Sequence, residues 1–261
     1  MNNWSPRTID RRNFSLGKFI DYCTERGITC VSEITPEAIT AYRRHLFHYR
    51  NERSGKNLKF CTQASYLSAV RHFLTWLFDQ NFITANPATE IELPKEEQRL
   101  PASYLNEGEV ETLLNIIDIT TPAGLRDRAI LETFYSTGMR RAELIKLQLD
   151  DLNRDDQLIM IRQGKGRKDR VVPIGQRALQ WIEKYFHDAR PSLIDEPTST
   201  LFLTTQGNKF HPTNLSQMVR PYLIAAGITK RGSCHMLRHS TATVMLEPTC
   251  DRFKHYSGTK T

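Results

Sequence analysis

The chain has 261 residues, of which 39% are hydrophobic and 25% charged, a balance typical of a folded globular protein rather than a disordered one. Its length predicts two domains, and the lack of a long apolar run excludes a transmembrane helix. Thirty-six Lys and Arg against 29 Asp and Glu give a net charge of +7, which suits a polyanionic partner but is shared by many ordinary enzymes.

The N-terminal residues and the cysteines both indicate a cytoplasmic protein. No apolar segment of the signal-peptide type follows Met1. The five cysteines are odd in number and widely spread, which argues against a disulfide framework and for a reducing compartment. We interpret them as small buried hydrophobic side chains.

The first third of the chain is predicted to be helical. Apolar residues recur at helical spacing over about residues 8–23, 36–49 and 62–79. Thr35 is a suitable N-cap for the second helix, with Pro36 in the favoured first position. No strand is expected before residue 85.

A proline-rich segment without periodicity follows these helices and predicts an interdomain linker. We therefore expect a helical domain at residues 1–85, a linker at 86–104 and a second domain at 105–261.

The second domain is predicted to mix helices with a little β structure. Two apolar strands around a Gly-Lys-Gly turn predict a β-hairpin within residues 158–174, and residues 201–203 predict a short strand. The fold class is therefore mainly α with a small β-hairpin or sheet. Helices are expected at about 107–117, 123–136, 140–147, 176–186, 214–226 and 235–246.

Two arginines lie where one helix is expected to end and the next to begin. Gly138 can end the first helix, Arg140 and Arg141 begin the second, and Glu143 is one turn away and placed to orient an arginine. A guanidinium offers a planar fork of donors that matches two phosphate oxygens. The alternative is an ordinary pair of surface arginines.

A second basic cluster, residues 162–170, carries five cations and one anion on the predicted hairpin. Glycines beside Lys165 allow the backbone to approach a phosphate closely. The spacing of a Walker-type loop is missing. The alternative is a solvated turn.

A third cluster places His235, Arg238 and His239 within about one turn of a predicted helix. The two histidines have the spacing of a zinc pair, but the acidic residue of the zinc motif is absent, so we expect no zinc. The alternative is a core or surface histidine pair.

Together the three clusters suit metal-free chemistry at a phosphodiester, because no carboxylate cluster is present to hold magnesium. The arginines would neutralise charge on the non-bridging oxygens in the transition state. The lysine could protonate the leaving 5′ oxygen, and the histidine could assist proton transfer. We expect no metal and no cofactor.

The sequence also resembles the tyrosine recombinase (phage integrase) family, especially its Xer-like, transposon and integron members. The resemblance rests on three motifs in the family's order: Thr-Gly-Met-Arg-Arg-Ala-Glu-Leu, Gly-Lys-Gly-Arg-Lys-Asp-Arg-Val-Val-Pro-Ile and His-Met-Leu-Arg-His-Ser-Thr-Ala-Thr. It implies a SAM-like helical core-binding domain, an α+β catalytic domain, and the catalytic residues Arg140, Lys165, His235 and Arg238. It also implies strand cleavage through a covalent 3′-phosphotyrosine and assembly as a tetramer on paired double-stranded DNA sites.

The last fifteen residues depart from the family pattern. A Leu-Gly-His segment and then the nucleophilic tyrosine are expected farther along, and Tyr256 is too near Arg238 to match. If the tail is back-translated and read in the frame that starts one base before the Glu247 codon, synonymous codons can be chosen that encode a segment containing Leu-Gly-His. We therefore expect a frameshift near codons 245–247, a truncated catalytic domain and no strand exchange by this chain alone.

The sequence leaves two functions open. The first is a truncated form of a site-specific DNA recombinase, and the second is a non-catalytic DNA-binding remnant that occupies recombination sites. A helical transcription regulator would leave the ordered arginine, lysine and histidine set unexplained. The residues that we expect to contact DNA are Arg43, Arg44, Lys56, Arg71, Arg167, Lys168 and Arg170.

Overall fold

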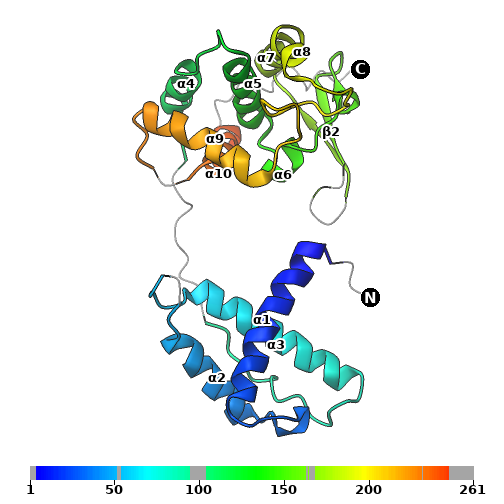
Figure 1. Ribbon diagram of the computed structural model, residues 1–261, viewed down its shortest axis with the longest axis vertical. Coiled ribbons are helices and arrows are strands. Elements are labelled where there is room, and N and C mark those ends of the chain that lie inside the picture. Colours follow the sequence, from blue (N-terminus) through cyan, green and yellow to red (C-terminus); the bar gives the residue numbers. More distant parts are fainter. Residues whose placement is uncertain are drawn as a thin grey trace. The chain divides into compact units, whose positions relative to one another are not determined.

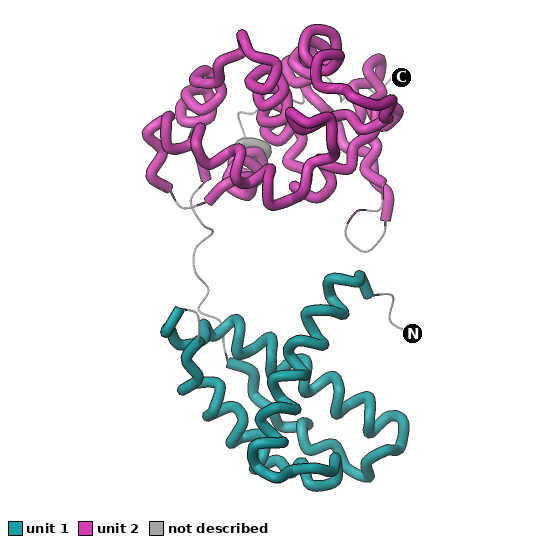
Figure 2. The backbone as a smooth tube through the Cα atoms, viewed as in Figure 1, with its two compact units in different colours: residues 1–98 teal, residues 99–261 magenta. Residues whose placement is uncertain are grey.

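The computed structural model describes residues 4–51, 54–94, 104–162, 164, 168–230 and 232–246. The chain divides into two compact units, residues 1–98 and 99–261 (Figure 2), each with its own hydrophobic core. The fold is mainly helical with one small antiparallel sheet, as the sequence predicts (Figure 1). Within the described ranges we find no helix with the length and apolar character needed to cross a bilayer.

Unit 1 is built from three helices: α1 (Pro6–Thr24), α2 (Pro36–His48) and α3 (Phe60–Asp79). A short 3-10 turn, Val31–Glu33, connects α1 and α2. The helices begin where the sequence offers caps, because the side chains of Ser5 and Thr35 accept hydrogen bonds from the first turns of α1 and α2.

The core of unit 1 lies where α1 and α2 pack against α3. Its centre is fully closed, since Tyr42, Leu67, Val70 and Leu74 have no exposed surface. Ala88 is also fully buried in this core, and Ile91 and Leu93 pack against it. Residues 86–94, which the sequence predicts as linker, therefore pack on unit 1.

Unit 2 is arranged around α5 (Pro122–Thr137), which buries 13 of its 16 residues. Four helices pack directly against α5: α4 (Glu107–Asn115), α7 (Gln176–Lys184), α8 (Arg190–Leu193) and α10 (Cys234–Leu246). A π-helical turn, Tyr185–Ala189, joins α7 to α8. Helix α9 (Pro212–Ala225) packs against α4, the short helix α6 (Arg141–Leu144) and α10.

The buried surface of α5 includes charged residues, and each of these has a partner. Arg126 pairs with Asp127 at 2.7 Å, and Arg128 pairs with Glu132 at 3.0 Å. Buried charges are tolerated when they are paired and hydrogen-bonded. The two arginines also donate to the carbonyls of Leu203 and Leu114, and these bonds connect the central helix to its surroundings.

A three-stranded antiparallel sheet lies beside the helices, in the order β1 (Leu152–Asn153), β2 (Leu158–Ile161) and β3 (Arg170–Pro173). A 3-10 turn, Leu149–Asp151, leads into it. The hairpin of β2 and β3 confirms the sequence prediction, and Ile161 pairs with Arg170 where the turn begins. The additional strand β1 was not predicted.

Two sequence predictions about this region are wrong, and they have one physical cause. The helix predicted over 140–147 is only the single turn of α6, and residues 201–203 form no strand: Leu203 makes one isolated bridge to Lys209, and Thr200 makes another to Gln148. Leu201 donates its backbone N–H to Leu147, and Leu149 donates to Ser199. Residues 147–149 and 199–201 therefore form backbone hydrogen bonds with each other. This pairing ends helix α6 early and is too short to form a β-strand.

The cysteines match their interpretation as buried side chains only in part. Cys23 and Cys234 are buried in the cores of units 1 and 2, but Cys30 and Cys61 are exposed. The interpretation is wrong for these two because Cys30 lies in the connection between α1 and α2, and Cys61 lies in the first turn of α3.

Candidate phosphate-binding site

The candidate site begins at the C-terminal end of α5, which Gly138 closes. Gly138 adopts the left-handed conformation with φ of 57° and donates its N–H to the Phe134 carbonyl. A Cβ at this position would also lie 3.3 Å from the side chain of Thr241 on α10. A glycine is needed here both for the turn and for the close approach of α10.

Glu143 fixes Arg140 directly after this turn. The backbone N–H of Arg140 donates to Glu143 Oε2 at 2.7 Å, and Arg140 Nη1 donates to Oε1 at 3.0 Å. This is one half of a capping box at the start of α6: Glu143 accepts the N–H of the N-cap residue Arg140, whose own side chain makes no cap hydrogen bond. The Glu143 side chain is 6% exposed and that of Arg140 is 41% exposed, so a buried carboxylate holds a guanidinium that reaches solvent. The interpretation that Glu143 orients an arginine is confirmed.

The same carboxylate binds a second arginine from the hairpin. Arg170 donates from Nη1 to Glu143 Oε1 at 2.8 Å and from Nη2 to Oε2 at 2.6 Å, a bidentate pair. Burial would raise the pKa of Glu143, but the hydrogen bonds from Arg170 and Arg140 outweigh it and lower the pKa to about 2. The carboxylate is therefore charged throughout the physiological range.

Helix α10 brings a further arginine to the same place. Arg238 Nη1 donates to the carbonyl of Gly138 at 2.6 Å, and one turn later the hydroxyl of Thr241 donates to the carbonyl of Tyr135 at 2.8 Å. Both bonds end on the last turn of α5, where carbonyls lack helical partners. Partial burial and the charge of Arg140 lower the pKa of Arg238. Arg140 and Arg238 thus meet at the end of α5.

His235 lies exposed on α10, one turn before Arg238. Partial burial of the ring, followed by the charge of Arg141, lowers the pKa of His235. Its imidazole is therefore neutral at neutral pH and can accept a proton. Arg141 itself is held by a hydrogen bond from Nη1 to Ser216 Oγ on α9, a contact that the sequence did not predict.

The predicted hairpin lysine, Lys165, lies outside the described residues, as does Arg167. The residues at the base of this turn are described: Gly164 donates its N–H to the Lys168 carbonyl at 3.0 Å. A Cβ on Gly164 would lie 2.7 Å from Arg170 Nη1. The base of the turn is therefore in close contact with the Arg170–Glu143 pair.

The predicted DNA-binding residues differ in their surroundings. Arg43 and Arg44 on α2, Lys56 and Lys168 are exposed, whereas Arg71 on α3 is half-buried. Arg170 is engaged by Glu143, as described above.

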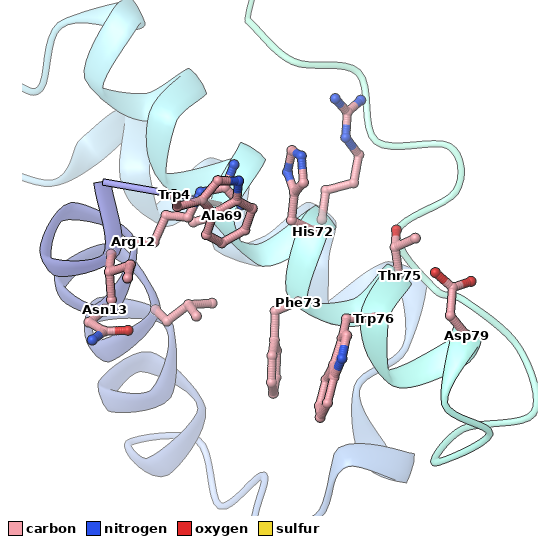
Figure 3. Close-up of a pocket in the computed structure, with 12 residues that line it drawn as sticks. Trp4, Arg12, Asn13, Ala69, His72, Phe73, Thr75, Trp76 and Asp79 are labelled. Atoms are coloured by element: carbon pink, nitrogen blue, oxygen red, sulfur yellow. The ribbon is translucent and has the colours of Figure 1, made fainter. Parts of the chain in front are cut away.

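Arg71 lines a cavity of about 570 Å³ in unit 1 between α1 and α3. Figure 3 shows the rings of Phe73 and Trp76 projecting from α3 into this hollow. Arg12 and Trp4 also line this cavity, and the guanidinium carbon of Arg12 lies over the Trp4 ring, 3.7 Å from the ring centre. This cavity combines aromatic rings with cations and contains none of the predicted catalytic residues.

The phage integrase family profile matches residues 103–252, which hold the end of α5, the hairpin and α10. The chain belongs to the phage integrase family. Tyrosine recombinase XerC 2 of Ralstonia nicotianae is 42% identical over 251 residues, which are 96% of this chain and 72% of that relative. Tyrosine recombinase XerD of Staphylococcus epidermidis is 33% identical over 248 residues, 95% of this chain and 81% of that relative. The chain is thus a member of the Xer-like tyrosine recombinases.

Solved structures of recombinases share the fold. XerH site-specific recombinase bound to palindromic difH substrate, in a post-cleavage complex, aligns with a TM-score of 0.71 and 22% identity over 91% of this chain and 68% of that chain. A lambda integrase dimer bound to a COC′ core site aligns with a TM-score of 0.69 and 17% identity, over 99% of this chain and 90% of that chain. The arrangement of a helical domain and a domain with a small sheet is therefore that of this family.

Proposed function

We propose that this chain binds double-stranded DNA and receives one phosphodiester at the C-terminal end of α5. The observation that carries the proposal is the meeting of Arg140 and Arg238 there: one is held by buried Glu143, and the other is bonded to Gly138. Two guanidinium groups that are each held by a hydrogen bond offer preorganised donors to non-bridging phosphate oxygens, where charge builds during transesterification.

The four predicted catalytic residues divide three roles between them in this proposal. In the family's reaction a tyrosine hydroxyl forms a bond to the phosphorus as the bond to the 5′ oxygen breaks. Arg140 and Arg238 would bind the phosphate in that step, and Lys165 on the hairpin turn would protonate the leaving 5′ oxygen once such a nucleophile is supplied. His235, neutral at neutral pH, accepts and returns a proton. None of these proposed steps calls for a metal ion or a cofactor.

We propose that unit 1 acts as the core-binding domain and supplies most of the sequence-independent DNA affinity. Exposed cations on and after α2 (Arg43, Arg44 and Lys56) would contact phosphates, with Arg71 on α3 and with Arg167 and Lys168 on the hairpin turn. Support comes from the similar recombinases whose structures contain DNA. One of these is a dimer on its site. We propose a homo-oligomer, a tetramer on paired sites, for the family's assembly and not for this chain alone, whose residues 247–261 depart from the family pattern.

We further propose that this chain binds DNA without forming a covalent phosphotyrosine. Residues 247–261 lack the Leu-Gly-His segment of the family pattern, and Tyr256 follows Arg238 too closely. A frameshift near codons 245–247 accounts for this tail. The second candidate function, a non-catalytic DNA-binding protein at recombination sites, rests on the same residues.

Covalent trapping on nicked suicide duplexes of randomised sequence tests this proposal. We expect DNA binding that weakens steeply with salt and no protein–DNA band that survives denaturation. A covalent band that disappears in Tyr256→Phe would contradict the loss of the nucleophile. Binding that ignores salt, or that is unchanged in Arg140→Gln, would contradict the phosphate site. Reading the gene across codons 244–261 and beyond tests the frameshift: a shifted frame without Leu-Gly-His would exclude it.

A further inference from the structure

We infer that Arg170 is a positioning residue, which sets Arg140 and the base of the hairpin turn through Glu143 rather than binding a DNA phosphate itself. This inference rests on the proposed function, because it assigns to Arg170 a role in the same phosphate site. It replaces the sequence interpretation in which Arg170 is one more DNA-contacting cation of the 162–170 cluster.

The first reason is that one buried carboxylate binds Arg170 through both of its terminal nitrogens. Both of its terminal nitrogens bond to Glu143, at 2.8 and 2.6 Å. This carboxylate is only 6% exposed, and its pKa of about 2 keeps it ionised. If Arg170 turned toward DNA, this buried carboxylate would lose two of the four hydrogen bonds that it accepts from Arg170 and Arg140, which is costly.

The second reason is that Glu143 connects Arg170 to Arg140. Oε1 of Glu143 accepts from the side chains of both arginines, at 2.8 Å from Arg170 and 3.0 Å from Arg140. Oε2 accepts from Arg170 Nη2 and from the backbone N–H of Arg140. Arg170 therefore fixes the plane of the carboxylate, and that plane directs both the backbone and the guanidinium of Arg140.

The third reason is the base of the hairpin turn. Gly164 lies so close to Arg170 that a Cβ would stand 2.7 Å from its Nη1, 3.0 Å from the Lys168 carbonyl and 3.5 Å from Glu143 Oε1. Gly164 directly precedes the segment that carries Lys165, and its N–H bonds to the carbonyl of Lys168. Arg170 thus gives the hairpin a fixed point on the same carboxylate that holds Arg140.

A double-mutant cycle tests this inference on the full chain, with the dissociation constant for a fluorescein-labelled DNA duplex of random sequence as the readout. We expect Arg140→Gln and Arg170→Gln each to weaken binding about tenfold, and the double variant to bind no more weakly than Arg140→Gln. We expect Arg170→Lys to behave as Arg170→Gln does, because an ammonium keeps the charge but not the fork.

A matched control separates positioning from loss of stability. Arg162 lies at the other side of the same hairpin and pairs at 2.6 Å with Asp151, whose side chain is 4% exposed. We expect Arg162→Gln to lower the melting temperature about as much as Arg170→Gln does. Its effect on the dissociation constant for DNA, however, should add to that of Arg140→Gln. The Nε–H NMR signal of Arg140, assigned by its loss in Arg140→Gln, should shift in Arg170→Lys and not in Arg162→Gln.

The possible results distinguish failure of the phosphate site from failure of the positioning role. If Arg140→Gln leaves DNA affinity unchanged, the proposed phosphate site fails and this inference fails with it. If Arg140→Gln weakens binding and the double variant shows the full effects of both substitutions, only the inference about Arg170 fails. It also fails if Arg170→Lys retains wild-type affinity. An equal coupling of Arg162→Gln to Arg140→Gln would also overturn it, because the effect would then be general to the hairpin.

Discussion

At the scale of single residues, Glu143 organises the candidate site. It is a buried anion that receives hydrogen bonds from two arginines of different elements, Arg140 and Arg170. The attraction is strong because the carboxylate is shielded from water, and it is useful because Arg140 keeps 41% of its side chain exposed. The negative charge of Glu143 therefore does not bind the ligand of the proposed phosphate site; it holds the positively charged arginines in place.

Glu143→Gln is expected to destabilise the protein at neutral pH and to flatten its acid response. The pKa of Glu143 is about 2 in the folded chain against an ordinary 4.5, so its contribution is complete above pH 4.5 and disappears as the pH falls to about 2. We expect a loss of about 2 kcal/mol at pH 7 in urea unfolding, and a much smaller difference from wild type near pH 2. A difference that is the same at pH 7 and near pH 2 would contradict this account.

The sequence predicts one half of this arrangement and misses the other. Arg140 and Glu143 are three residues apart at a helix start, and that spacing alone places the carboxylate on the arginine. Arg170 is 27 residues from Glu143 and meets it only because the β2–β3 register brings it there. No local pattern encodes that register, so Arg170 resembles any other cation of its cluster.

At the scale of elements, the site depends on how α5 ends. Gly138 closes the helix in a left-handed turn, and α10 approaches so closely that Thr241 and Arg238 bond to carbonyls of the last turn. Directly after this turn, Arg140 stands at the N-terminus of α6. The relative position of the two arginines is therefore set by one helix end.

Gly138→Ala is expected to lower the free energy of unfolding by about 2 kcal/mol, because it combines backbone strain with a contact to Thr241. Gly27, which follows α1 with φ of 69°, is the matched control, because a Cβ added there would meet nothing within 4 Å. Gly27→Ala carries only the backbone strain and should cost about 1 kcal/mol. Thermal unfolding measures both, and an equal loss would show that the approach of α10 is not limiting.

Helices with clear apolar periodicity were predictable as elements, whereas short elements were not. Helices α2, α3 and α5 lie close to their predicted ranges because their apolar spacing is regular, and α2 and α5 also begin at a threonine cap followed by proline. The early end of α6 depends on backbone bonds between residues 147–149 and 199–201. Such bonds join segments some fifty residues apart, and neither segment signals the pairing by itself.

At the scale of the whole molecule, the chain has two separate cores. The larger belongs to residues 105–237, and the other belongs to residues 19–88. Each core contains fully buried leucines, among them Leu67 in unit 1 and Leu131 in unit 2. Units with separate cores can unfold as separate cooperative transitions.

Leu67→Ala and Leu131→Ala are expected to act on different transitions in scanning calorimetry. Each removes a fully buried side chain and should cost about 3 kcal/mol in its own unit. We expect each substitution to lower one transition and leave the other in place. A single transition that both substitutions lower equally would contradict separate folding units.

The lowered pKa of His235 has a consequence for how binding and chemistry respond to acid. Partial burial and the neighbouring arginines keep its imidazole neutral, so at neutral pH it brings a lone pair and no charge. Mild acidification adds a positive charge beside the arginines, which favours DNA, and at the same time removes the group that can take up a proton. Affinity for DNA would then rise as the pH falls while the proposed proton acceptor is lost, so tight binding would be a poor guide to a site that can assist proton transfer.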